Sequence, residues 1–127
     1  MLAHLRQRVE DVLAPVQTAN LSTSGPAGIQ SRVFPCEAVG MWLYLLVPGT
    51  SDHLFNLEHE PTAVVSTKQW QLHGRGCTIP LSQAPPTLSL PHSPDAPGCV
   101  LVKIQPMRLQ INQPQGWGNG ETIDITD

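Results

Sequence analysis

The spacing of hydrophobic residues changes along the chain and divides it into helical and extended stretches. In residues 2–13 the apolar side chains recur every three or four positions, which predicts an amphipathic helix that ends before Pro15. Residues 18–23 and 29–34 then alternate, and the glycines and proline between them are typical of a turn. We therefore expect an N-terminal helix followed by a β-hairpin.

A continuous apolar run follows the hairpin. Residues 41–47 have the length and composition of a strand, and their lack of alternation predicts a central strand that is buried on both faces. Thr50 or Ser51 is a good N-cap for a short helix near residues 52–60, because its hydroxyl can accept a hydrogen bond from a free amide of the first turn. Pro61 ends that helix.

Two further strands are predicted over residues 62–67 and 70–73. Lys68 and Gln69 lie between them, and the glycines that follow are residues at which a strand can bulge or bend. With the hairpin and the central strand, four or five strands are expected up to this point.

The C-terminal part combines a proline-rich stretch with extended segments. Residues 80–97 hold six of the thirteen prolines and no long periodic segment, so we expect a stiff irregular loop. Residues 99–104 and 107–111 predict strands that bend at Pro106, and residues 116–120 predict a turn-rich ending. The chain is thus expected to be mainly β.

Length and composition limit the class of protein. The chain has 127 residues, which fit a single domain over residues 1–127 with one core. Hydrophobic residues make up 40% and charged residues only 13%, so we expect a partner to cover apolar surface, most simply in a homodimer. The net charge of -3 and the scattered Lys and Arg residues argue against nucleic-acid binding.

No segment has the pattern of a membrane span or of a secretory signal. The longest apolar runs fall short of the ~20 residues that a span needs, and charged residues interrupt residues 2–13. A protein that does not contact the membrane, in the cytoplasm, is therefore expected.

The cysteines and histidines form no recognisable motif. Cys36, Cys77 and Cys99 are odd in number and widely spaced, which argues against a disulfide framework and against a cysteine zinc site. The histidines lie in separate segments or far apart on one short helix, so no metal site is predicted. No GxSxG elbow supports hydrolase chemistry.

Four segments in a fixed order carry a family resemblance. They are Ser31-Arg32-Val33-Phe34, the segment from Thr50 and Ser51 to Pro61, Lys68-Gln69-Trp70 followed by Gly74, and residues 102–109 with their central Pro106. In this order they resemble the pyridoxamine 5'-phosphate oxidase-like, FMN-binding split-barrel family. The resemblance spans roughly residues 2–111 and implies a Greek-key split β-barrel of about six to seven strands.

The resemblance implies an FMN-dependent oxidoreductase whose cofactor lies at a homodimer interface, with a small-molecule substrate that the sequence does not identify. Arg32 and Val33 lie on the strand that the family places near the flavin phosphate. Thr50, Ser51 and His53 belong to the segment that would supply further donors, since a phosphate needs hydroxyls, amides and charge-assisted hydrogen bonds.

Lys68 and Gln69 are implied at the other end of the flavin. Gln69 would bond the pyrimidine edge of the ring, and Lys68 would bias its potential. The residues themselves leave simpler interpretations open. Arg32 fits an exposed strand arginine, Ser51 fits an N-cap and no more, and Lys68 and Gln69 fit a hairpin turn with solvated side chains. Trp70 fits a core or interface position better than a stacking one.

Some positions depart from the family pattern. The oxidase has basic residues where this chain has Asp52 and His53, and a lysine where this chain has Glu37. Its C-terminal Trp and Arg substrate motif is absent, so we expect a relative of the oxidase and not that enzyme. The alternative is a split-barrel homodimer that has lost flavin binding and acts as a binding or structural module, and a deazaflavin or a haem is the alternative ligand.

Overall fold

A computed structural model describes residues 1–113 and 119–125. Within these residues the chain forms helices, strands and two short 3₁₀ turns. In chain order they are α1 (Ala3–Leu13), β1 (Thr18–Thr23), β2 (Gln30–Val39), β3 (Trp42–Pro48), α2 (Asp52–His59), β4 (Thr62–Ser66), β5 (Trp70–Ile79), η1 (Leu81–Gln83), η2 (Leu90–His92), β6 (Cys99–Asn112) and β7 (Asn119–Asp124).

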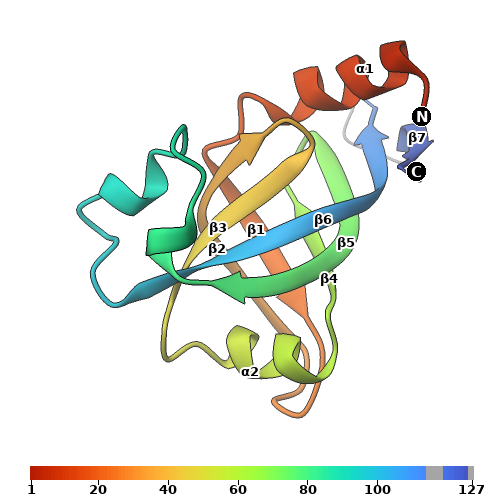
Figure 1. The fold of residues 1–127 in the computed structure, drawn as a ribbon. Coiled ribbons are helices and arrows are strands. Elements are labelled where there is room, and N and C mark those ends of the chain that lie inside the picture. Colours follow the sequence, from red (N-terminus) through yellow and green to blue (C-terminus); the bar gives the residue numbers. More distant parts are fainter. Residues whose placement is uncertain (114–118, 126–127) are drawn as a thin grey trace.

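Six antiparallel strands close into a barrel, and a seventh extends one wall (Figure 1). The strand order is β3-β2-β1-β4-β5-β6-β7, and the barrel closes because β3 also pairs with β6. The chain passes from β3 through α2 to β4, which pairs with β1 on the far side of the first hairpin, so the connection is a Greek key. The predicted split β-barrel and its two helices are therefore confirmed.

The first hairpin has the alternation that the sequence predicts. Ala19 and Leu21 of β1 and Phe34 and Cys36 of β2 point into the barrel and are buried. Burial of a large apolar side chain stabilises the fold by about 1.5–3 kcal/mol. Burial also raises the pKa of the Cys36 thiol to about 12, so this cysteine is a protonated core residue and not a nucleophile.

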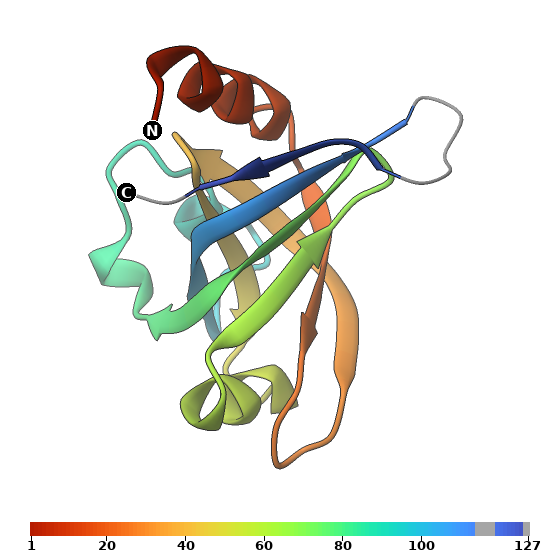
Figure 2. The same ribbon diagram turned by 90° about the vertical axis from the view of Figure 1, so that its right-hand side faces the viewer.

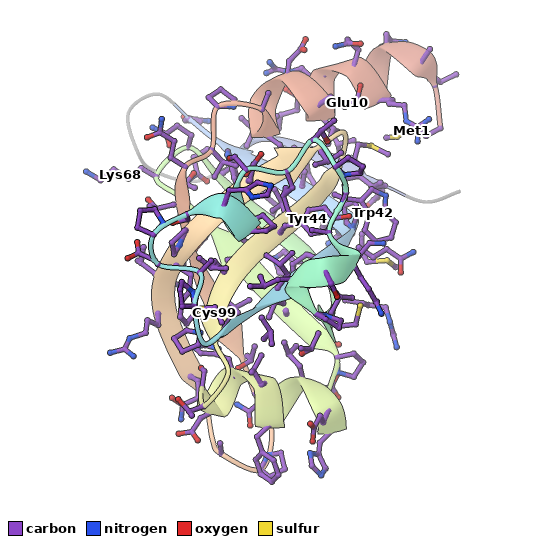
Figure 3. All side chains as sticks on the ribbon, turned by 60° about the vertical axis from the view of Figure 1, so that its left-hand side comes forward. Met1, Glu10, Trp42, Tyr44, Lys68 and Cys99 are labelled. Atoms are coloured by element: carbon purple, nitrogen blue, oxygen red, sulfur yellow. The ribbon has the colours of Figure 1, made fainter. Side chains whose placement is uncertain are left out.

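β3 is buried on both faces, as its apolar run predicts. Alternate residues enter the barrel core, while Tyr44 and Leu46 lie on the outer face. Leu88 and Leu90 of the irregular segment 80–97 pack over them, on the side of the barrel where Figure 3 labels Tyr44. The proline-rich segment is thus a cover for the barrel wall.

Glu37 fastens this cover to the barrel. Its carboxylate accepts hydrogen bonds from the amide and hydroxyl of Ser89 and from the amide of Leu90, at 2.7–3.1 Å. These donors lie at the start of η2, so the acidic side chain caps that turn.

The two helices lie at opposite ends of the barrel (Figure 2). α1 covers one end with Val9 and Leu13, and α2 covers the other with Leu57. Among residues 1–113 and 119–125, no helix is long and apolar enough to cross a membrane.

A buried side-chain amide ties α2 to the turn of the first hairpin. The fully buried Asn56 accepts a hydrogen bond from the Ala27 amide at 2.9 Å and donates to the Gly28 carbonyl at 2.8 Å. It also donates to Oγ1 of Thr23 at 3.2 Å. These bonds satisfy the polar groups of the turn and fix α2 against β1.

His53 extends the same network and is held in its neutral form. Its Nδ1 lies 2.9 Å from Oγ1 of Thr23, which also accepts from Asn56, and the tautomer of the ring decides which of the two atoms donates. Burial lowers the pKa of His53, and the nearby Arg32 lowers it further, while Asp52 opposes the shift. The ring is therefore buried and uncharged near neutral pH.

β5 and β6 are longer than the sequence predicts. β5 continues past position 73, with a register shift between His73 and Gly74. A Cβ at Gly74 would overlap the carbonyl oxygen of Gln105, so the glycine permits a close approach of two strands. β6 runs unbroken through Pro106, so the two strands expected there are one.

β7 is not predicted by the hydrophobic pattern. It pairs with the C-terminal half of β6, and Ile123 and Ile125 join the core. Positions 116–118 of the expected C-terminal turn lie outside the described residues, and the following positions belong to β7.

The Asn56 network predicts a large stability effect for a small change. Asn56→Ala removes three hydrogen bonds and strips buried partners from the hairpin turn, so the free energy of unfolding should fall by about 2–4 kcal/mol. Denaturant unfolding measures the loss. Gln30→Ala is the matched control, because Gln30 donates one bond to Ala27 of the same turn and should cost about 1 kcal/mol or less. Equal losses would contradict the role of Asn56.

The lowered pKa of His53 predicts a loss of stability in mild acid. The unfolded chain takes up a proton at this histidine near its ordinary value of 6.5, whereas the folded chain resists protonation. The unfolded state then binds more protons, so stability is lost as the pH falls through the ordinary value of 6.5. His53→Gln keeps a hydrogen-bonding group near Thr23 but cannot titrate, so its unfolding free energy should depend less on pH.

A histidine on the surface provides the control for this experiment. His4→Gln changes an exposed residue of α1 and should keep the wild-type pH profile of unfolding. If the profile of His53→Gln also matched the wild type, the buried histidine would not be the titrating group.

Candidate functional site

The barrel is split where β2 leaves β3. In the described part of the chain, β2 pairs with β3 only over residues 36–39, while residues 30–35 pair with β1 alone. The open edge of β2 and the start of α2 enclose a cavity of about 580 Å³, here termed the α2 hollow. It is lined by Gln30, Ser31, Arg32, Phe34, Pro48, Thr50, Ser51, Asp52 and His53.

A second depression lies beside the same hairpin, next to the end of α1. Its volume is about 820 Å³, and it is here termed the α1 groove. Its lining is largely apolar and comes from α1, β1, β2 and the turn between β4 and β5. The residues are Val12, Pro15, Val16, Gln17, Thr18, Ala19, Asn20, Val33, Ser66, Thr67, Lys68, Gln69 and Trp70.

The residues predicted to hold a cofactor all line one of these two depressions. The α2 hollow is lined by the residues that are expected near the phosphate, which are Arg32, Thr50, Ser51 and His53. The α1 groove is lined by the other predicted cofactor-binding residues, which are Val33, Lys68 and Gln69. The predicted site is thus divided into two parts, one on each side of a strand.

Arg32 and Val33 point to opposite faces of β2, as successive strand residues do. Arg32 pairs with Leu21, which faces the barrel interior, but it is itself exposed where the barrel opens toward α2. Val33 pairs with Asn20 on the outer surface and is 61% exposed.

Arg32 is the cation among the residues that line the α2 hollow, and Asp52 is the anion. His53 adds no charge near neutral pH, because burial and the neighbouring Arg32 both lower its pKa. Its ring is also engaged, because Nδ1 contacts Thr23 and the ring makes a T-shaped contact with Phe34, at 5.3 Å between ring centroids. The positive charge of the hollow therefore comes from Arg32.

Hydroxyl groups at the start of α2 line the same hollow as Arg32. Ser51 is the N-cap, and its Oγ accepts from the His53 amide at 3.3 Å, which confirms the N-cap interpretation. The hydroxyl proton of Ser51 remains available to a ligand. Thr50 precedes it at an exposed position of the same lining. An anion in the hollow would thus meet hydroxyls and the positive end of a helix.

Lys68 and Gln69 form the turn between β4 and β5, as the hairpin interpretation predicts. Thr67 Oγ1 accepts from the amides of Gln69 and Trp70 at 3.1 and 3.3 Å, and the side chain of Asn112 donates to the Lys68 carbonyl at 2.8 Å. The backbone is held on both sides while Lys68 projects outward (Figure 3). Trp70 is only 3% exposed, in agreement with a core position.

Three outward-facing residues connect the two depressions, and the sequence pattern does not single them out. Asn20 Nδ2 donates to Ser31 Oγ at 2.8 Å and to Ser22 Oγ at 3.1 Å, and the two hydroxyls lie 3.1 Å apart. Asn20 lines the α1 groove and Ser31 lines the α2 hollow. We term these residues the hairpin polar cluster. Their outward positions followed from the predicted alternation, but their place between two cavities did not.

Glu37 does not belong to the lining of either depression. Its carboxylate caps η2 and holds the cover over β3. The departure from the family lysine at this position therefore adds no negative charge to the lining of the α2 hollow.

Sequence comparison finds no relatives: no family model matches the chain, and no curated protein matches it. Structural comparison does. A protein from Clostridium acetobutylicum related to general stress protein 26 of B. subtilis, of the pyridoxinephosphate oxidase family, matches with a TM-score of 0.68 and 10% identity, over 98% of this chain and 97% of that chain.

Two other solved structures with the same fold belong to differently named proteins. An F420 reductase has a TM-score of 0.59 and 15% identity, over 79% of this chain and 94% of its own. A heme binding protein from Mycobacterium smegmatis has a TM-score of 0.64 and 14% identity, over 98% of this chain and 58% of its own. At these identities the likeness establishes the fold. This chain has the split-barrel fold of the pyridoxamine 5'-phosphate oxidase-like proteins.

Proposed function

We propose that this chain binds FMN and is a flavin-dependent oxidoreductase acting on a small molecule. One observation carries the proposal: a charged hollow and an apolar groove share one hairpin. FMN has a matching division, with a phosphate at one end and a planar ring system at the other. A bound flavin supplies the redox chemistry, and the residues of the chain bind it and orient it.

The α2 hollow fits the phosphate. Arg32 offers a planar fork of donors, and the hydroxyls of Thr50 and Ser51 add neutral ones. Asp52 opposes the phosphate charge, but it is exposed and so is screened by water. His53 contributes no charge to this site, and its neutral ring holds the start of α2 against Thr23 of β1.

The α1 groove fits the ring. Val12, Val16 and Val33 supply apolar walls for a flat aromatic system. The side chain of Gln69 can hydrogen-bond a polar ring edge. The ammonium of Lys68 would stabilise the anion that forms when a flavin is reduced.

We further propose that a second copy completes the groove in a homodimer. Val33 and Ile29 are 61% and 84% exposed although both are large and apolar. A partner over this side of the hairpin would remove them from water and would exclude water from the ring. A cytoplasmic location is part of the same proposal and rests on the sequence alone.

A second candidate is a split-barrel module that has lost its flavin and serves in binding or structure. The observation in its favour is that a single arginine lines the α2 hollow together with an aspartate. A deazaflavin or a haem is the alternative ligand, because the fold also occurs in an F420 reductase and in a heme binding protein. Absorbance of the purified protein, before and after incubation with FMN, separates these cases by the band positions.

Removal of the cation in the α2 hollow should weaken FMN binding. Arg32→Ala deletes a charge-assisted contact to phosphate, which is worth about 1.5–3 kcal/mol, so the Kd should rise about tenfold or more. Quenching of flavin fluorescence on titration measures the Kd.

Arg75→Ala serves as the matched control, because Arg75 is an exposed arginine on β5 that lines neither depression. Its Kd for FMN should equal that of the wild type. An unchanged Kd for Arg32→Ala would remove Arg32 from the site, and absence of FMN binding by the wild type would favour the module without flavin.

The homodimer has its own test in sedimentation equilibrium. The wild type should sediment with twice the mass of the chain, and Val33→Asp should shift it toward the monomer, because a buried carboxylate without a partner is costly. Thr78→Asp adds the same charge at an exposed position of β5 and should leave the dimer intact. A monomeric wild type at all concentrations would contradict the proposal.

A further inference from the structure

The hairpin polar cluster lies between the two ends of the proposed site. On β2, Val33 lines the groove and Ser31 lines the hollow, and they stand about 7 Å apart along the strand. On β1, Asn20 and Ser22 are their direct partners, so all four side chains share the outer face. A ligand that extends from the groove to the hollow along the outer face of the hairpin therefore crosses the cluster.

The cluster has hydrogen-bonding capacity left over. The contacts of the Asn20 side chain within the described chain are made by its Nδ2, which leaves Oδ1 as an acceptor. Of the two serine hydroxyls, one donates to the other, so the second retains its proton. The surface between the depressions thus presents both an acceptor and a donor, held in place by three mutual contacts.

We propose that Asn20, Ser22 and Ser31 bind the hydroxylated carbon chain that links the ring of the ligand to its phosphate. This inference rests on the proposed function and extends it to the part of the ligand that lies between its ring and its phosphate. Hydroxyls of a polyol both donate and accept, which suits a surface that offers both. The ring in the groove and the phosphate in the hollow place such a chain directly over the two strands.

The proposal also limits the class of ligand. A flavin or deazaflavin nucleotide carries a polyol between its ring and its phosphate, whereas a haem has none. A polar cluster between an apolar and a cationic subsite therefore favours a flavin or deazaflavin nucleotide over a haem.

Three flavins that differ stepwise provide the test: FMN, riboflavin without the phosphate, and lumiflavin without either the phosphate or the polyol. The double variant Asn20→Ala, Ser31→Ala is titrated with each of them beside the wild type. We expect its Kd to rise about fivefold to tenfold for FMN and for riboflavin, the scale of one or two neutral hydrogen bonds. The Kd for lumiflavin should change less than that for riboflavin, although Asn20 also lines the groove that holds the ring.

Two control variants separate the linker from its neighbours. Arg32→Ala should raise the Kd for FMN and leave riboflavin unchanged, because it contacts the phosphate alone. Gln71→Ala changes an outward-facing residue of β5 that lines neither depression and should alter none of the three affinities.

An unchanged affinity of the double variant for riboflavin, or an equal loss for lumiflavin, would overturn the linker site while leaving the FMN proposal standing. Failure of the wild type to bind any of the three flavins would overturn the proposed function, and the linker site with it.

Discussion

The split between β2 and β3 is the constraint on which the candidate site depends. β3 pairs with β6 over its residues 43–48, but with β2 over its residues 42–45 only. One end of β3 therefore follows β6 while the start of β2 follows β1, and the wall opens between them. Arg32 lies at this opening, so its charge reaches solvent instead of lying inside a closed barrel, where it would be costly. α2 enters at the same place, which brings the Ser51 hydroxyl to the same hollow.

Local signals in the sequence predict much of this fold, and non-local pairing accounts for what they miss. The hairpin, β3 and α2 each have a pattern within a few residues: alternation, an apolar run, or the N-cap Ser51. β5 can continue through position 74 because a glycine there leaves room for the Gln105 carbonyl oxygen, which lies too close for a side chain. Nothing near position 74 in the sequence reveals that neighbour. β7 likewise depends on a free edge of β6.

Some residues of the candidate site could be recognised from their type and order in the sequence, and others only from the structure. Arg32 and Ser51 could be found because a phosphate needs an arginine and hydroxyls, and the order of segments resembled a flavin-binding family. Asn20 and Ser22 carry no such signal, since polar residues are ordinary on the outer face of a hairpin. The contact of Asn20 with Ser31 depends on strand register, and its position between two cavities depends on the split.

The charges around the α2 hollow decide how it would hold a dianion. Glu37 adds no charge to the lining because its carboxylate caps η2, and His53 is neutral because burial and Arg32 lower its pKa. Arg32 thus supplies the positive charge, and Asp52 offsets part of it. A phosphate held by a single guanidinium depends on neutral donors and on contacts elsewhere along the ligand. The weaker the cationic end, the larger the share of the affinity that must come from the groove and from the strands between.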